Sequence, residues 1–184
     1  MTVHICREPD ESHPNEWLKR AAHSDTIKFP GVDSCLAMAF LMSNGSMVGA
    51  HVGVFWAGQS EMSDDCAKKM LKAMLDCLHV SDGRIAKFLM ITDLARAADA
   101  GLKVGGGGTF ANEGSFYFDT NAREAQVRLK RSETIDMCVF NKVTGAVDIE
   151  LNGNASLLTI HRSNRTVLSV NFSKIKSGTT DIPN

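Results

Sequence analysis

The sequence lacks an excess of charge of either sign and lacks any long apolar run. Its 184 residues include 20 Lys and Arg against 21 Asp and Glu, a net charge of -1. Nucleic acids and anionic membranes attract basic surfaces, so neither is expected as a partner. No run of 18 apolar residues occurs, and residues 1–17 are polar where a secretory signal needs an apolar segment. We therefore expect a chain that is cytoplasmic or is secreted without a cleaved signal peptide.

Cysteine pairs of the CxxC type are also missing, although cysteine itself is present. The five cysteines are Cys6, Cys35, Cys66, Cys77 and Cys138. An odd count without a CxxC pair argues against a zinc or redox site and favours a reducing compartment. The histidines His4, His13, His23 and His79 have no metal-ligand spacing to one another. The sequence therefore predicts no metal and no cofactor.

Composition and pattern predict a single domain, residues 1–184, of the α+β class. A chain with 43% hydrophobic residues can bury a substantial core. Helices are expected over residues 11–24, 60–79 and 93–100. Strands are expected over 26–29, 35–42, 47–56, 84–92, 135–140, 146–151, 157–161 and 167–172. This order indicates a mixed or antiparallel, sandwich-like β-sheet core that is flanked by helices.

Two of the expected strands, 35–42 and 47–56, should form a β-hairpin. The connection Ser43-Asn44-Gly45-Ser46 contains Asn-Gly, a strong hairpin signal because both residues tolerate positive φ. Both strands are apolar at most positions and do not alternate with polar residues, so both of their faces should be covered. The hairpin is therefore expected in the core.

Cys35 and His51, one on each strand of this hairpin, are the candidate catalytic residues. A cysteine is a nucleophile as thiolate, and an adjacent imidazole lowers the thiol pKa and can supply the proton for a departing amine. A two-residue turn places His51 opposite Met38, so that the two side chains lie on opposite faces. A three-residue loop or a bulge brings both to one face, with His51 opposite Ala39 and about 13 Å from Cys35 along the strand.

The run Asp33-Ser34-Cys35, an apolar strand, a turn and a second strand carrying His51 resembles the Cys-His glutamine deamidase superfamily. That superfamily contains the chemotaxis receptor deamidase CheD, the catalytic domain of cytotoxic necrotizing factor and Burkholderia lethal factor. The resemblance covers about residues 26–151, and the spacing between Cys35 and His51 carries its specificity. Either a backbone carbonyl or the Thr26 hydroxyl is expected to orient His51. The AHVGVFW segment also resembles the histidine strand of NlpC/P60 peptidases, whose cysteine lies much further upstream.

The resemblance implies a Cys-His amidohydrolase of toxin or effector type that deamidates glutamine side chains of a protein substrate. Cys35 would form a thioester with the side chain, and His51 would move the protons. Interception of the thioester by an amine would give transglutamination instead, and the sequence leaves that choice open, as it does the oligomeric state. The alternative is a non-catalytic α+β interaction protein, of accessory or immunity type, with Cys35 and His51 as core residues.

Overall fold

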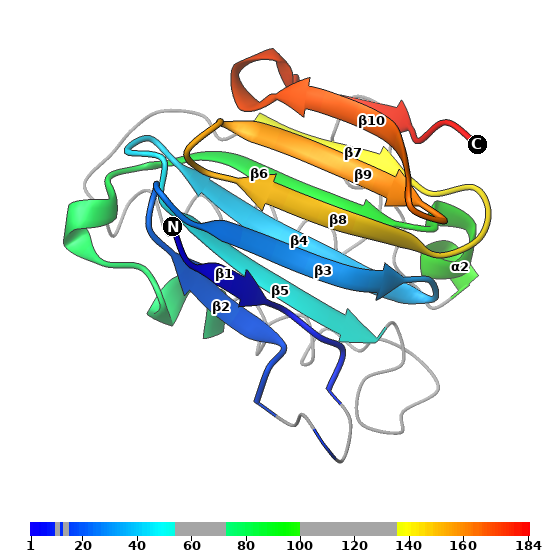
Figure 1. Ribbon diagram of the computed structural model, residues 1–184, viewed down its shortest axis with the longest axis horizontal. Helices are drawn as coiled ribbons and strands as arrows, with labels where there is room; N and C mark the ends of the chain where they lie inside the picture. Colours follow the sequence, from blue (N-terminus) through cyan, green and yellow to red (C-terminus); the bar gives the residue numbers. More distant parts are fainter. Residues whose placement is uncertain (10–11, 13–14, 54–72, 100–135) are drawn as a thin grey trace.

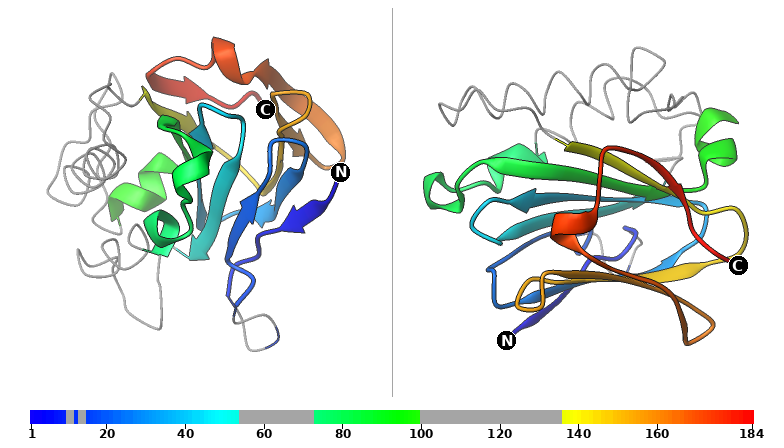
Figure 2. Two further views of the ribbon diagram at one scale, coloured as in Figure 1. Left: turned by 90° about the vertical axis from the view of Figure 1, so that its left-hand side faces the viewer. Right: turned by 90° about the horizontal axis from the view of Figure 1, so that it is seen from above.

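Two β-sheets packed face to face make up the described part of the chain (Figure 1, Figure 2). The computed structural model describes residues 1–9, 12, 15–53, 73–99 and 136–184. The five-stranded sheet has the order β1 (Val3–Ile5), β3 (Thr26–Val32), β8 (Val147–Asn152), β9 (Leu157–Arg162) and β10 (Arg165–Asn171). The six-stranded sheet has the order β11 (Gly178–Asp181), β7 (Asp136–Asn141), β6 (Ile85–Thr92), β4 (Cys35–Met42), β5 (Met47–Gly53) and β2 (Leu18–Ala21).

Both sheets are mixed. The pairs β1–β3, β6–β7 and β7–β11 are parallel, and the other neighbouring strands are antiparallel. Because β4 runs antiparallel to β6, the first residue of β4 lies at the same end of the sheet as the last residues of β6 and β7. Cys35 therefore begins its strand beside Thr92 and the chain that follows β7.

Strand β4 is covered on both faces, as the sequence predicted. All eight of its residues are buried. Cys35 and Leu41 belong to the core between the two sheets, whereas Leu36 and Phe40 belong to a second cluster on the opposite face. That second cluster includes Met74 from the helical residues 73–76. The hairpin β4–β5 thus lies between the five-stranded sheet on one face and this second cluster on the other.

The two sheets approach closely near the middle of β5. Phe29 of β3 points across the interface, and a Cβ atom added to Gly49 of β5 would lie 2.7 Å from its ring. Ala39, which pairs with Gly49, is also small and fully buried. Small residues on the six-stranded sheet therefore make room for the aromatic ring of the other sheet.

The expected α+β class is wrong, because strands dominate and no layer of helices flanks the sheets in the described residues. Residues 18–21 of the helix expected over 11–24 form strand β2 instead. Pairing of β2 satisfies the edge of β5, and the His51 amide extends it by donating to the Trp17 carbonyl at 2.8 Å. These non-local hydrogen bonds override a weak local helix preference.

The other expected helices are short or lie partly outside the described residues. Residues 60–72 lie outside them, and only 73–76 of the helix expected over 60–79 are seen as helical. The helix expected over 93–100 is α2 (Leu94–Asp99). Two further turns of 3-10 helix are η2 (Val80–Asp82) and η4 (Phe172–Lys174). The expected strand over 47–56 is described as β5 up to Gly53, and its last three residues lie outside the described part.

Candidate functional site

Three loop residues, 43–45, separate Met42 of β4 from Ser46, which lies opposite it, and this length fixes the hairpin register. The Met42 amide donates to the Ser46 carbonyl at 2.9 Å, and Leu41 pairs with Met47. Gly45 has φ +85°, the left-handed conformation that closes a three-residue hairpin loop. The Asn44 side chain accepts hydrogen bonds from the Ser46 amide at 2.9 Å and from its hydroxyl at 2.7 Å. The two-residue turn is therefore excluded.

This register places Cys35 and His51 on one face of the hairpin as diagonal neighbours. His51 pairs with Ala37, and Cys35 pairs with Gly53. The expected pairing of His51 with Ala39 is wrong, because the extra loop residue shifts the register in the opposite sense. Diagonal neighbours across an antiparallel pair lie roughly 7–8 Å apart, so the expected separation of about 13 Å is also wrong. The observed register therefore brings the two candidate residues closer together than either register expected from the sequence.

The His51 ring is held by a backbone carbonyl that fixes its tautomer. His51 is 2% exposed, and its Nδ1 lies 3.2 Å from the carbonyl oxygen of Cys6. A carbonyl oxygen only accepts, so Nδ1 carries the proton and Nε2 keeps its lone pair. Burial lowers the pKa of His51, although the Cys6 carbonyl and the nearby Glu8 charge oppose that shift. The ring is therefore neutral, and its buried Nε2 has no hydrogen-bond partner among the described residues.

The Cys35 thiol is bound by an acidic side chain that pattern analysis did not single out. Its Sγ donates to Oε2 of Glu8 at 2.9 Å. Burial, followed by this hydrogen bond to a carboxylate, raises the pKa of Cys35 to about 12. Cys35 is 3% exposed and Glu8 is exposed, so the Glu8 side chain meets the thiol from the surface. In the described residues no hydrogen bond joins Cys35 to His51, and the thiol is protonated.

The turn before Cys35 is anchored by a buried lysine. Lys142 follows β7, is 1% exposed, and places its Nζ 3.4 Å from Oδ1 of Asp33. The Lys142 amide donates to the Thr92 carbonyl at 2.8 Å, and the Thr92 hydroxyl donates to the Cys35 carbonyl at 3.2 Å. A backbone hydrogen bond at Asp33 acts on the thiol in the opposite sense to Glu8 and lowers its pKa. The ends of β6 and β7 therefore hold the entrance of β4 in place.

Sequence reasoning found Cys35 and His51 but missed Cys6, Glu8 and Lys142. Glu8 is 27 residues from Cys35 in the chain, and Cys6 is 45 residues from His51. Neither belongs to a motif, and no periodicity connects them with the hairpin. Of the two groups expected to orient His51, a backbone carbonyl has that role, but it comes from the N-terminal strand region.

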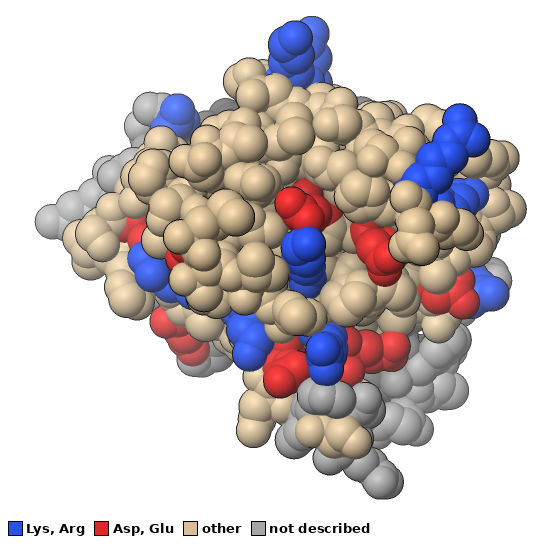
Figure 3. Space-filling model, in the orientation of Figure 1, with Lys and Arg blue, Asp and Glu red and all other residues tan. Residues whose placement is uncertain are grey.

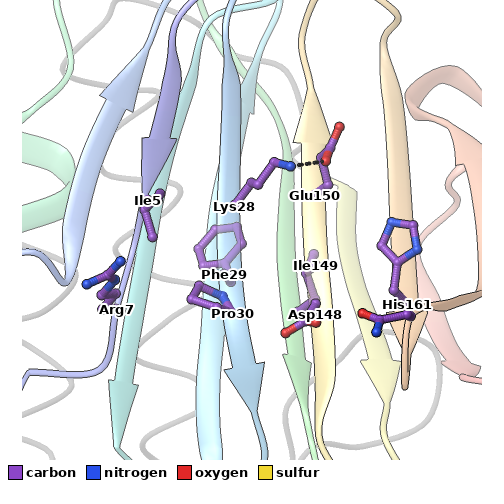
Figure 4. A pocket seen from close by; sticks show the side chains of 10 residues that line it. Ile5, Arg7, Lys28, Phe29, Pro30, Asp148, Ile149, Glu150 and His161 are labelled. Carbon is purple, nitrogen blue, oxygen red and sulfur yellow. Dashed lines mark ion pairs between the residues drawn. The ribbon is translucent and has the colours of Figure 1, made fainter.

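A second polar region lies on the outer face of the five-stranded sheet. Figure 3 shows charges of both signs on this face, and Figure 4 shows the side chains that line a pocket over β3 and β8. The volume of this pocket is about 430 Å³. Lys28 forms an ion pair with Glu150 at 2.9 Å, and the Gly31 amide donates to Asp148 at 2.7 Å. These polar groups already have partners within the chain, and neither Cys35 nor His51 lines the pocket.

Comparisons with models of known protein families and with curated proteins find no match for this chain. In the part of the chain that the structure describes, no helix is both long enough and apolar enough to span a membrane. The same residues contain no group of three or more His, Cys, Asp or Glu side chains that could bind a metal ion. Any functional conclusion therefore rests on the chemistry of the Cys35 and His51 site.

Proposed function

We propose that this chain is a Cys-His amidohydrolase that deamidates glutamine side chains of proteins through a thioester, as the resemblance to the deamidase superfamily implies. One observation supports this above the others: the three-residue loop makes Cys35 and His51 diagonal neighbours on one face, and the Cys6 carbonyl leaves the lone pair on His51 Nε2. A neutral imidazole whose Nε2 keeps its lone pair can act as the general base that activates a nearby thiol.

In the proposed reaction, the Cys35 proton passes to His51 Nε2 while the sulfur bonds to the carboxamide carbon. The carbon–nitrogen bond then breaks, and ammonia leaves with the proton from His51. Water, activated by the same Nε2, hydrolyses the thioester and releases a glutamate side chain and the free thiol. The turn anchored by Lys142 supplies the backbone N–H groups that would bind the oxyanion, the Cys35 amide among them.

A second candidate is a non-catalytic interaction protein, of accessory or immunity type, in which Cys35 and His51 are core residues. The observation that favours it is the burial of Cys35, which is 3% exposed and whose thiol pKa is raised to about 12. A thiol in that state is not a nucleophile near neutral pH. The two candidates differ in whether the chain turns over an amide.

Ammonia release from unfolded casein, a glutamine-containing protein, tests the proposal. We expect release by the wild-type chain to stop in Cys35→Ser and to fall by about 10² to 10⁴ in His51→Ala, the usual contribution of a general acid–base. Cys77→Ser is the matched control, because Cys77 packs against the cluster on the opposite face of the six-stranded sheet and should leave the rate unchanged. Ammonia release that persists in Cys35→Ser would falsify the assignment.

A further inference from the structure

We propose that Glu8 occupies the place of the substrate's own side chain, so that the chain holds a product-like residue in its reaction site. This inference rests on the proposed function. Deamidation converts a glutamine side chain into a glutamate side chain of the same length. The Glu8 carboxyl, with Oε2 2.9 Å from the Cys35 sulfur, lies where the carboxyl of such a product would lie before it leaves.

The backbone on the N-terminal side of Glu8 is fixed, whereas its side chain is exposed. Cys6 is fully buried, its amide donates to the Lys28 carbonyl at 2.8 Å, and its Sγ donates to the Gly49 carbonyl at 3.4 Å. The Cys6 carbonyl that orients His51 is therefore held independently of Glu8, two residues further on. Rotation of the exposed Glu8 side chain can open the site without disturbing the histidine.

The charge of Glu8 makes its contact with the thiol inhibitory. The Glu8 carboxylate is in hydrogen-bond contact with the Cys35 sulfur and disfavours the thiolate. The same charge favours a protonated His51, but it acts there without a hydrogen bond. A glutamine carboxamide has nearly the same shape but no charge, so it would remove this penalty when it replaces Glu8. The site should therefore admit an exposed glutamine of a protein chain and be blocked by its own glutamate until Glu8 turns away.

Glu8→Gln converts the blocking residue into an internal substrate and gives a sharp test. The Cys35 sulfur would bond to the side-chain carbon at position 8, its proton would pass to His51, and ammonia would leave. Water would then hydrolyse the thioester and restore glutamate. We expect the intact mass to fall by one ammonia and then to return to the wild-type value, with one ¹⁸O retained at position 8 in H₂¹⁸O. Peptide mapping locates the change.

Two controls separate catalysis from spontaneous deamidation. Glu8→Gln combined with Cys35→Ala should keep its mass, and so should Glu150→Gln, whose side chain faces Lys28 on the outer surface of the other sheet. Conversion at the same rate in the Cys35→Ala background would overturn the proposal. Retention of its mass by a folded Glu8→Gln chain would also overturn the placement of Glu8.

The casein assay, run with the wild type and with Glu8→Ala, then distinguishes the two proposals. Cys35-dependent ammonia release alongside an unchanged Glu8→Gln mass means that the deamidase function stands and only the placement of Glu8 fails. No release from either chain, together with an unchanged Glu8→Gln mass, means that both fail. Should Glu8→Gln not fold, alkylation of Glu8→Ala by iodoacetamide at pH 7 replaces it. We expect Cys35 to react about tenfold faster than in the wild type, because loss of the carboxylate uncovers the thiol and favours the thiolate. An equal rate overturns the placement.

Discussion

The buried polar groups near the two ends of the β4–β5 hairpin differ in how many hydrogen-bond and ion-pair partners they have. At the loop end, the carboxylate of Asp82 is 2% exposed and is bound by the Arg20 guanidinium in a two-pronged ion pair and by the His79 amide at 2.7 Å. At the open end, the Cys35 thiol donates to the exposed side chain of Glu8, and His51 Nε2 has no hydrogen-bond partner among the described residues.

At the loop end, hydrogen bonds to the residues around η2 hold the hairpin in place, and these contacts do not involve the open end where Cys35 and His51 lie. Asn44 donates to the Ser81 carbonyl at 3.0 Å, and the Arg84 amide donates to the Ser43 hydroxyl at 3.1 Å. Residues around η2 thus hold the three-residue loop, and the loop sets the register along the whole hairpin. A buried group without a partner costs free energy, and such groups concentrate where chemistry is done. We infer that the contacts at the loop end stabilise the fold and that the proposed chemistry of Cys35 and His51 takes place at the open end.

The largest expected effect comes from breaking the ion pair at the loop end. Arg20→Met leaves the buried Asp82 carboxylate without its cation and should lower the free energy of unfolding by about 3 kcal/mol. Glu8→Ala, the corresponding loss at the open end, removes an exposed side chain and should cost less than about 1 kcal/mol. Urea unfolding of both variants measures the difference, and equal losses would show that the two ends do not differ.

A smaller effect is expected when the loop backbone is strained. Gly45→Ala places a Cβ in the left-handed conformation and 3.0 Å from His23 Cβ, and should cost about 2 kcal/mol. Gly145→Ala is the matched control, because Gly145 has φ +62° but open space around it, and should cost about 1 kcal/mol. Thermal unfolding of the two variants isolates the contact with His23. Equal losses of stability in the two variants would mean that the contact with His23 relaxes at no measurable cost.

The smallest effect is the pH dependence that the open end adds. Burial lowers the pKa of His51 in the folded chain, so its contribution to stability is present above the unfolded value of about 6.5 and is lost as the pH falls below it. We expect the wild type to lose up to about 1 kcal/mol more than His51→Leu between pH 7.5 and 5. Urea midpoints at the two pH values give this slope. Parallel slopes would mean that His51 is not held neutral.

Strands were predictable from the sequence because their patterns are local. The expected segments 84–92, 146–151 and 157–161 coincide within one or two residues with β6, β8 and β9. The helix expected over 11–24 failed because β2 is stabilised by its partner β5, which no local window contains. The dominance of strands in the described residues follows from such pairings, which composition does not reveal.

The candidate site was predictable in part for the same reason. The Asn-Gly signal located the hairpin, but the loop length depends on the Asn44 side chain and on the contacts around η2. The register, and with it the relation of Cys35 to His51, therefore could not be read from the loop sequence. Cys6 and Glu8 reach the site only through the packing of β1 on β3, which is a property of the folded chain.

The carbonyl that fixes the His51 proton belongs to the chain just after β1, in the five-stranded sheet, whereas the ring belongs to β5, in the six-stranded sheet. Neither sheet alone carries an oriented base. The Cys6 carbonyl can reach the His51 ring only when the two sheets are packed together. A partly unfolded chain with the sheets apart therefore lacks the hydrogen bond that fixes the His51 tautomer. Closure of the sandwich is therefore also the step that orients the His51 ring.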